Sequence, residues 1–349
     1  MTMHTVRFLS ASALLCAAAC AHAQSSVSIY GMLDVGIVRD SGIAGGGSVL
    51  KVSSGVFNGS RLGFRGNEDL GGGLSAIYTM EMGFQADTGA LGQGGLAFGR
   101  QVFVGLSSKD YGALKFGRQY SAIDQVVGNS DPFGSGGAGR NASLVAARFV
   151  NGTKSYYNNR INNSVMYTSP VINGFSGDMG YGFGESVDST HSGRYVGASI
   201  GYAQGPLYAR LASQDIVNAA GNGSVRNSIF GASYNFGPVT GYFSYSWGDA
   251  REAGVRQTHD SDVLLGVAVP VSASGRVIAS YVAKNDKLAA NRDANLVAIG
   301  YLHDLSKRTT LYASGGRIHN KNGAGYSVNT SIDVGPGTRS ADIGIRHTF

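Results

Sequence analysis

The chain has 349 residues and a formal net charge of +6 at pH 7, and only 14% of its residues are charged. Its 54 glycines, 18 tyrosines and 15 phenylalanines exclude a disordered chain, which has few aromatic residues, and glycine does not recur at every third position as in collagen. No run of lysine or arginine points to nucleic acid as a partner, and the composition is typical of many short strands joined by glycine-rich turns.

The N-terminal segment 1–23 has the features of a secretory signal peptide. Arg7 precedes the apolar stretch FLSASALLCAAAC and the small-residue cleavage site AHA, so we expect the mature chain to begin at Gln24. The stretch is too short for a membrane-spanning helix. A lipoprotein signal at Cys20 is an alternative, but AAAC lacks the branched apolar residue typical of such sites. Because Cys16 also lies here, we expect no disulfide in the mature chain.

Segments that alternate between apolar and polar residues recur through the whole mature chain. SRLGFRGN places Arg61 and Arg65 opposite Leu62 and Phe64, and the same period of two continues in LSAIYTMEMGFQ and GYFSYSW. This period is typical of half-buried strands. Sixteen strands are predicted, at 27–38, 59–67, 74–85, 98–107, 112–119, 164–169, 175–184, 194–203, 207–215, 226–236, 239–249, 260–269, 275–285, 295–304, 309–319 and 340–349.

The gaps between these strands alternate between long and short without exception. A transmembrane barrel has short turns on one side of the membrane and longer loops on the other, whereas a soluble sandwich has no reason to alternate. The sequence therefore predicts an all-β fold, a 16-stranded antiparallel transmembrane β-barrel over residues 24–349. A barrel of this size encloses an aqueous channel.

The chain ends in SADIGIRHTF, which keeps the period of two up to Phe349. Chain ends usually fray, so a terminal strand with such regular alternation needs a neighbour along its length. Closure of the barrel supplies that neighbour, because it pairs the last strand with the first, SVSIYGMLDVGIV. Both ends are then expected on the side of the short turns, the periplasm.

Several segments together resemble the general porins of Gram-negative bacteria, of the trimeric type found in beta-proteobacteria. They are SSVSIYGMLDVGI, GSRLGFRGNEDLGGGLSAIYTMEMGF, FGRQVFVGL, GALKFGRQYSA and the terminal Phe349. The resemblance implies an integral protein of the cell outer membrane, in contact with its lipid, that assembles as a homotrimer. It also implies that Phe349 is the signal read by the barrel-assembly machinery. Phe349 can at the same time be one of the lipid-facing aromatic residues.

The third long gap, residues 120–163, is much longer than its neighbours and contains DPFGSGGAGRNASLVAARF. This segment is too apolar to extend freely into water, and loops of this length are usually functional or disordered. In the porins that the chain resembles, the third loop folds into the barrel and narrows the channel. DPFGSGG is similar to the tip of that loop, although here the acid, Asp131, precedes Pro132.

Five arginines are candidates for the wall of this constriction. Alternation places Arg61 and Arg65 in the lumen, and Arg160 shares its face with Asn162 and Ser164. The resemblance maps Arg61, Arg100 and Arg160 onto the basic wall of the family. The remaining candidate, Arg118, lies at a strand end, and a contact at a subunit interface is the alternative to a place in the constriction.

Arg100 presents a conflict, because it shares its alternation with Val102, Val104 and Leu106, which would face lipid. An arginine in the middle of a bilayer costs about 2–4 kcal/mol. We therefore expect Arg100 to point into the lumen and the three apolar residues to pack under the inserted loop.

The charges of the third gap predict which ions pass. Asp124 and Asp131 are outnumbered by the basic residues of the loop, which are Arg140, Arg148, Lys154 and Arg160. Charged rings in a narrow pore select ions by sign. We therefore expect a passive channel for small hydrophilic solutes and ions that prefers anions and needs no cofactor.

Three other functions were considered. The sequence has no HExxH, GxSxG or GxxxxGK[ST] motif, so nothing in it predicts an enzyme or a bound metal. An adhesin would carry larger outer loops than those expected here. The closest rival is a substrate-specific anion channel, for which Tyr156 and Tyr157 near the constriction give a weak indication.

Overall fold

The computed structural model describes residues 26–150, 153–155, 159–328 and 337–349. The expected signal peptide, residues 1–23, and the tyrosines Tyr156 and Tyr157 lie outside these residues. None of the described helices is long and apolar enough to cross a membrane.

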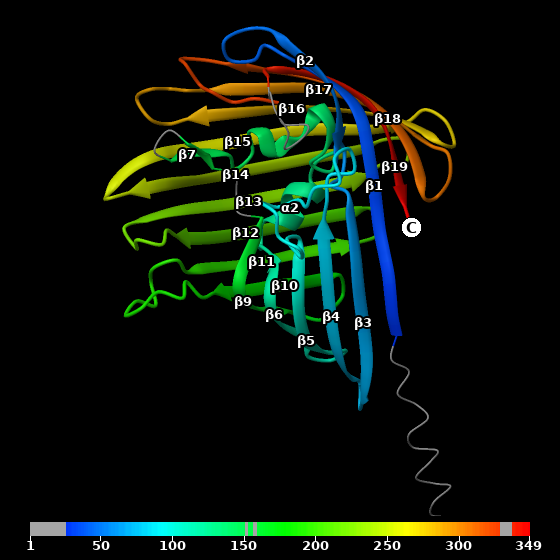
Figure 1. The fold of residues 1–349 in the computed structure, drawn as a ribbon, viewed down its shortest axis with the longest axis vertical. Coiled ribbons are helices and arrows are strands. Elements are labelled where there is room, and N and C mark those ends of the chain that lie inside the picture. Colours follow the sequence, from blue (N-terminus) through cyan, green and yellow to red (C-terminus); the bar gives the residue numbers. More distant parts are fainter. Residues whose placement is uncertain (1–25, 151–152, 156–158, 329–336) are drawn as a thin grey trace, which may run out of the picture.

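Strands dominate the described residues (Figure 1). The strands of the large sheet are β1 (Ser26–Ser41), β2 (Ser48–Ser54), β3 (Arg61–Gly71), β4 (Leu74–Gly83), β5 (Gln101–Ser108), β6 (Gly112–Tyr120), β9 (Arg160–Thr168), β10 (Phe175–Gly182), β11 (Tyr195–Gln204), β12 (Leu207–Val217), β13 (Gly223–Asn235), β14 (Thr240–Glu252), β15 (Val255–Pro270), β16 (Gly275–Asp286), β17 (Ala294–Asp304), β18 (Thr309–Asn320) and β19 (Arg339–Thr348). Between β6 and β9 lie α2 (Asp124–Asn129), η2 (Gly137–Gly139), η3 (Asn141–Ser143), β7 (Arg148–Val150) and β8 (Thr153–Ser155).

The sheet closes on itself, because β1 pairs antiparallel with β19 from Met32↔Thr348 to Ser41↔Arg339. The other edge of β1 pairs with β3 along its first half and with β2 along its second half. β2 and β3 therefore fill one position between them, and the 17 strands of the sheet form a barrel of sixteen positions. This confirms the predicted fold class, including the pairing of the first strand with the last.

β2 was missed, because its residues were assigned to the first gap. Its sequence SVLKVSS alternates for only a few residues after the glycine-rich turn GIAGGG. The strand is then interrupted at residues 55–60, where Gly55 has a φ of +68°. The ladder with β1 stops at Ser54 and resumes where β3 begins at Arg61.

The strict alternation of gap lengths is wrong at one hairpin. β14 and β15 are joined by residues 253–254 alone, a shorter connection than the turns 236–239 and 271–274 on the opposite side. Both strands continue with polar residues such as Arg251 and Arg256. The ladder thus extends past the apolar pattern from which the strand ends were predicted.

The two faces of the sheet differ in chemistry. On β1 and β19 the apolar side chains Ile37 and Ile343 are 52% and 60% exposed, whereas Asp34 and Asp342 on the other face are buried. The exposed apolar face continues around the barrel, for example at Leu265 and Val267. An outward apolar band of this kind is what lipid requires.

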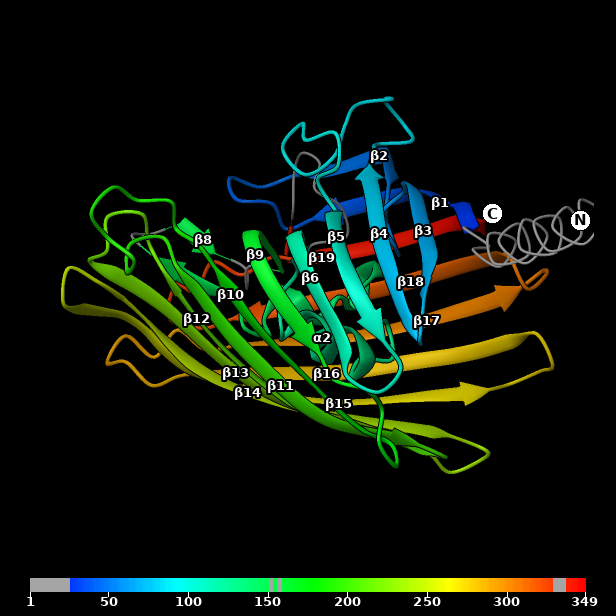
Figure 2. The same cartoon turned by 90° about the horizontal axis from the view of Figure 1, so that it is seen from below.

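Residues 121–147 pack against the inward face of the sheet. α2 contacts β12 and β13, while η2 contacts β17, β18 and β19. Both views place α2 within the ring of strands (Figures 1 and 2). Ile123 and Leu144 of this segment join a buried apolar cluster with the wall residues Ile229, Leu264 and Leu296.

Three hydrogen bonds tether this segment to distant strands. The backbone N–H of Ala122 donates to the hydroxyl of Tyr195 at 2.9 Å, and that of Ala146 donates to Asp262 Oδ2 at 3.0 Å. The N–H of Ala138 donates to Ser314 Oγ, also at 2.9 Å. Because the tethers lie on β11, β15 and β18, they hold the segment across the width of the barrel.

Candidate functional site

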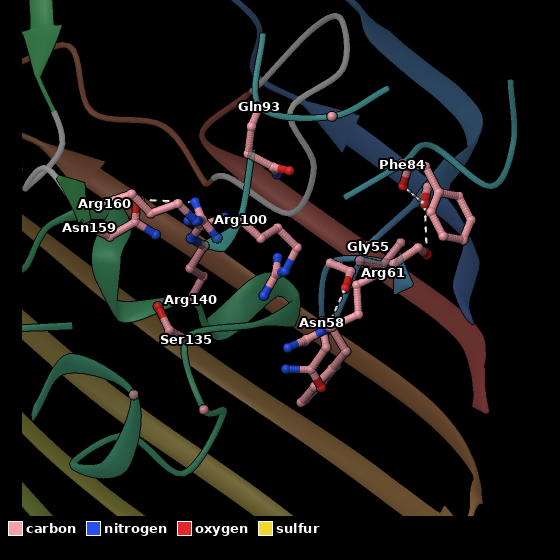
Figure 3. A pocket seen from close by; sticks show the side chains of 18 of the residues that line it. Gly55, Asn58, Arg61, Phe84, Gln93, Arg100, Ser135, Arg140, Asn159 and Arg160 are labelled. Atoms are coloured by element: carbon pink, nitrogen blue, oxygen red, sulfur yellow. Dashed lines mark hydrogen bonds between the residues drawn. The ribbon is translucent and has the colours of Figure 1, made fainter. Parts of the chain in front are cut away.

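A cavity of about 440 Å³ lies between the wall and residues 124–140 of the inserted segment. Four arginines line it, and their side chains lie around the same space (Figure 3). Among the lining residues that the structure describes, Asp124 is the only acid. The arginines are Arg61, Arg100, Arg140 and Arg160.

Arg61 enters the cavity at the point where β3 begins. Its Nε donates to the carbonyl oxygen of Gly59 at 3.1 Å, so the interruption at residues 55–60 orients the side chain. That interruption is organised by Asp34, a fully buried carboxylate on β1. Asp34 accepts hydrogen bonds from Asn58 N–H at 2.8 Å and from the Tyr312 hydroxyl at 2.7 Å.

Arg100 is held by two partners. Its Nε is 2.6 Å from Glu81 Oε1, and its Nη2 donates to the Tyr120 hydroxyl at 2.8 Å. Glu81 also accepts a hydrogen bond from the Tyr30 hydroxyl at 3.0 Å. The absence of a side chain at Gly59 leaves room for Arg100, since a Cβ there would lie 2.9 Å from Nη1.

The predicted explanation for the inward orientation of Arg100 is wrong. Val102, Val104 and Leu106 are exposed on the outward face and do not pack under the loop. β5 begins only at Gln101, so Arg100 precedes the strand and escapes its alternation.

Arg160 also lines the cavity, but not because of the alternation from which its position was predicted. The β6–β9 ladder shifts register between Gly117 and Gln119, which interrupts the alternation used to place it. Its guanidinium carbon lies 4.9 Å from the centre of the Tyr120 ring, and Nη2 donates to that hydroxyl at 3.3 Å. Tyr120 therefore joins Arg100 and Arg160 in one network.

The fourth arginine, Arg140, was counted in the charge of the loop but not assigned to the site. It follows η2 on the segment that crosses the barrel. In the described part of the chain, Nε of Arg140 and Nε of Arg160 are buried without a hydrogen-bond partner. Both guanidinium groups line the cavity, where their other N–H groups can donate to an anion.

Three of the expected residues do not line this cavity. Arg65 lies over the ring of Tyr30 at 5.2 Å. Arg118 pairs with Val102 on the outward face and donates to the carbonyl oxygen of Gly99 at 2.9 Å and to Asn162 Oδ1.

The third of them, Asp131, lies inside the loop, where it accepts the N–H groups of Phe133, Ser135 and Asn141. Burial raises the pKa of this carboxyl to about 7, although the three N–H groups act in the opposite direction. Its position supports the loop and does not contribute a charge to the cavity.

The cavity is electropositive. With Glu81 and Asp124 counted against the four arginines, the net charge is +2. The guanidinium groups keep this charge at any physiological pH, because arginine does not deprotonate in proteins. Positive charge in a narrow space with low-dielectric walls attracts anions and repels cations.

Comparison with known proteins gives consistent matches along the chain. The model of a family described as Gram-negative porin matches residues 10–323. An outer membrane porin protein of Bordetella pertussis and outer membrane porin protein 32 of Delftia acidovorans are each 32% identical, over 98% of this chain and 99% of theirs. The solved structure of an anion-selective porin from Comamonas acidovorans is 30% identical and superimposes with a TM-score of 0.81, covering 93% of this chain and all of the other.

Proposed function

This chain belongs to the Gram-negative porin family and is an integral protein of the outer membrane, and from that premise we propose that it is a general diffusion porin that prefers anions. The family and the fold point to a channel rather than to an enzyme. The observation that carries the anion preference is the group of four arginines around one cavity with a net charge of +2.

In the proposed mechanism, small hydrophilic solutes move down their gradient through the space between the wall and residues 121–147, which serve as the constriction. The arginines raise the local concentration of anions. The guanidinium groups of Arg140 and Arg160 line this space and replace part of the hydration shell of a passing anion. The similar porin from Comamonas acidovorans is anion-selective, in agreement with this mechanism.

A substrate-specific anion channel is the alternative, favoured by the placement of Tyr120 against Arg160 in the cavity. The two functions differ in how current depends on the solute. A general porin conducts in proportion to salt concentration, whereas a specific channel saturates and is blocked by its substrate.

Recording single channels in planar bilayers tests the proposal. We expect stepwise conductance in groups of three, in line with the proposed homotrimer, and a reversal potential in a KCl gradient that reports chloride preference. A reversal potential of the opposite sign would contradict the anion preference. Absence of conductance from folded protein would contradict the channel itself.

We also propose that Phe349 is read by the barrel-assembly machinery. Its backbone exchanges hydrogen bonds with Gly31 on β1, and its ring covers the Cα of that glycine. Deletion of Phe349 should lower the amount of folded protein in the outer membrane several-fold, while refolding of the purified variant into detergent stays close to that of the wild type. Heat-modifiable mobility in gels measures both quantities. Equal losses in both assays would indicate a packing role alone.

A further inference from the structure

Four glycines on the inward face of the wall lie directly under the inserted segment, residues 121–147. They are called the seat glycines below, and they are Gly231 on β13, Gly266 on β15, Gly300 on β17 and Gly316 on β18. A Cβ atom added at these positions would meet the segment at 2.7, 2.6, 3.1 and 2.3 Å, in this order at Ser130, Pro132, Phe133 and Ala138. Residues 130–138 therefore cross the wall strand by strand, in close contact with each glycine.

Two of the seat glycines belong to a row of small residues that crosses four adjacent strands in register. Gly266 pairs with Ser280, Ser280 pairs with Ala298, and Ala298 pairs with Gly316. Ser280 and Ala298 are buried, so this row is covered. The next inward row, on the side away from the short turns, contains large residues that pair in the same way, namely Leu264, Val282, Leu296 and Ile318. The wall thus steps down at the row of small residues, and the segment lies over this lower part.

The closest approach between the wall and the segment involves the main chain. The carbonyl oxygen of Ala138 lies 2.3 Å from the place that a Cβ of Gly316 would occupy. The N–H group of the same residue donates to Ser314 Oγ at 2.9 Å. Glycine weakens the interior of a strand and often marks a position where another backbone comes close. The seat glycines therefore determine how deeply the segment lies against the wall.

The other side of the segment faces the cavity. Ser135 and Arg140 of the segment line the cavity together with Asn58 and Arg61, which come from the wall at the start of β3 (Figure 3). The segment thus separates the seat glycines from the space through which solutes pass. Any movement of the segment away from the seat glycines narrows that space.

We propose that the seat glycines set the size limit of the channel, whereas the arginines of the cavity set its preference for anions. This inference rests on the proposed function as a porin. A Cβ at Gly266 would meet Pro132 at 2.6 Å, and restoring an ordinary contact of 3.4–4 Å moves the turn after α2 by about 1 Å toward the cavity. The arginines keep their charge, so the sign of the ion preference does not change.

The test compares Gly266→Ala with the control Gly315→Ala in the full mature chain. Gly315 also lies in a strand, but it pairs with the exposed Ile299 on the outward face. The atom nearest to a Cβ there is the carbonyl oxygen of Ser340, at an ordinary distance of 3.9 Å. The control therefore makes the same chemical change in the wall without touching the segment.

Single-channel recording and the swelling of proteoliposomes in sugars of increasing size are the measurements. We expect Gly266→Ala to have roughly half the wild-type conductance and to exclude sugars that the wild type admits. Its reversal potential in a KCl gradient should keep the sign that reports chloride preference. Gly315→Ala should match the wild type in all three measurements.

A compensating variant separates the contact with the segment from a general loss of stability. Pro132→Ala removes Cγ and Cδ of the ring, the two atoms that a Cβ at position 266 would meet most closely. Because residues in contact are coupled, Gly266→Ala/Pro132→Ala should regain most of the wild-type conductance and size limit. If Gly266→Ala does not fold, Gly231→Ala gives the same readout, since the three atoms nearest to a Cβ there all belong to the side chains of Ser130 and Val126.

Three results would overturn the proposal. The first is wild-type conductance and size limit in folded Gly266→Ala and Gly231→Ala. The second is a double variant that conducts as little as Gly266→Ala, which would assign the effect to the strand itself. The third is loss of anion preference in Gly266→Ala, which would contradict the separation of size from charge. Each is measured against a wild type that conducts, whereas failure of the proposed channel would leave the wild type itself without current.

Discussion

Replacing Arg61 and Arg100 together by alanine is expected to reduce the ratio of chloride to potassium permeability roughly fivefold. The double change removes two of the four positive charges around the cavity. It also frees Glu81, whose carboxylate is bound to Arg100 at 2.6 Å. The remaining positive charge is then balanced by Glu81 and Asp124, and the cavity loses its preference for anions. The measurement is the reversal potential in a KCl gradient across a planar bilayer.

The structure supplies the controls for this experiment. Arg65 and Arg118 do not line the cavity, so their joint replacement by alanine removes the same charge and should leave the reversal potential near the wild-type value. A buried carboxylate without its partner is strongly destabilising. The variant Arg61→Ala/Arg100→Ala/Glu81→Gln therefore keeps the test interpretable if the double variant folds poorly. If the folded variant Arg61→Ala/Arg100→Ala has the selectivity of the wild type, the protein is still a porin, but this cavity does not determine its ion selectivity.

Replacing Asp131 by alanine is expected to widen the channel. The change leaves the N–H groups of Phe133, Ser135 and Asn141 without their acceptor, at a cost of about 1–3 kcal/mol for each buried group. The loop tip should then detach from the wall, where Phe133 packs near Phe57 with ring centres 6.2 Å apart. We expect higher and noisier single-channel conductance, and faster swelling of proteoliposomes in sugars that the wild type excludes.

Two comparisons separate this effect from a simple loss of charge. Asp110→Ala removes an exposed carboxyl from the turn 109–111 and should leave the size limit unchanged. Asp131→Asn keeps an oxygen acceptor, and because burial raises the pKa of Asp131 to about 7, the neutral side chain should be tolerated far better than alanine. A size limit identical in Asp131→Ala and the wild type would show that these hydrogen bonds do not hold the constriction.

The fold could be predicted because alternate residues of a membrane strand face lipid and the lumen, so apolar and polar residues alternate in the sequence. Ile37 and Ile343 face lipid while Asp34 and Asp342 face inward, and this contrast is visible in the sequence. β2 could not be found in the same way, since it is short and is interrupted at Gly55. Its partner on β1 is fixed by hydrogen bonds that no local pattern reveals.

The site was harder to predict than the fold. Alternation placed Arg61 in the lumen, but Arg100 precedes its strand and Arg160 follows a register shift, so neither position obeys the period of two. Arg140 lines the cavity because it lies on the segment that crosses the barrel. The course of that segment depends on tertiary packing, so the position of Arg140 could not be predicted from a local pattern. Asp34 gave no signal in the sequence, because a buried carboxylate that orients a backbone looks like any polar residue on the inward face.

The pairing of β1 with β19 also determines how the chain can fold. The hairpins on the short-turn side join neighbouring strands through a few residues, so each costs about 1 kcal/mol in loop-closure entropy. The pairing of Met32 with Thr348 brings together the two ends of the barrel, and for a flexible chain of that length such a closure costs about 5 kcal/mol. Until it forms, the chain is an open sheet with two free edges, which can pair with other chains and aggregate. We therefore expect ring closure to be the slow step of folding, and we expect protection of both edges until then to raise the yield of folded barrels.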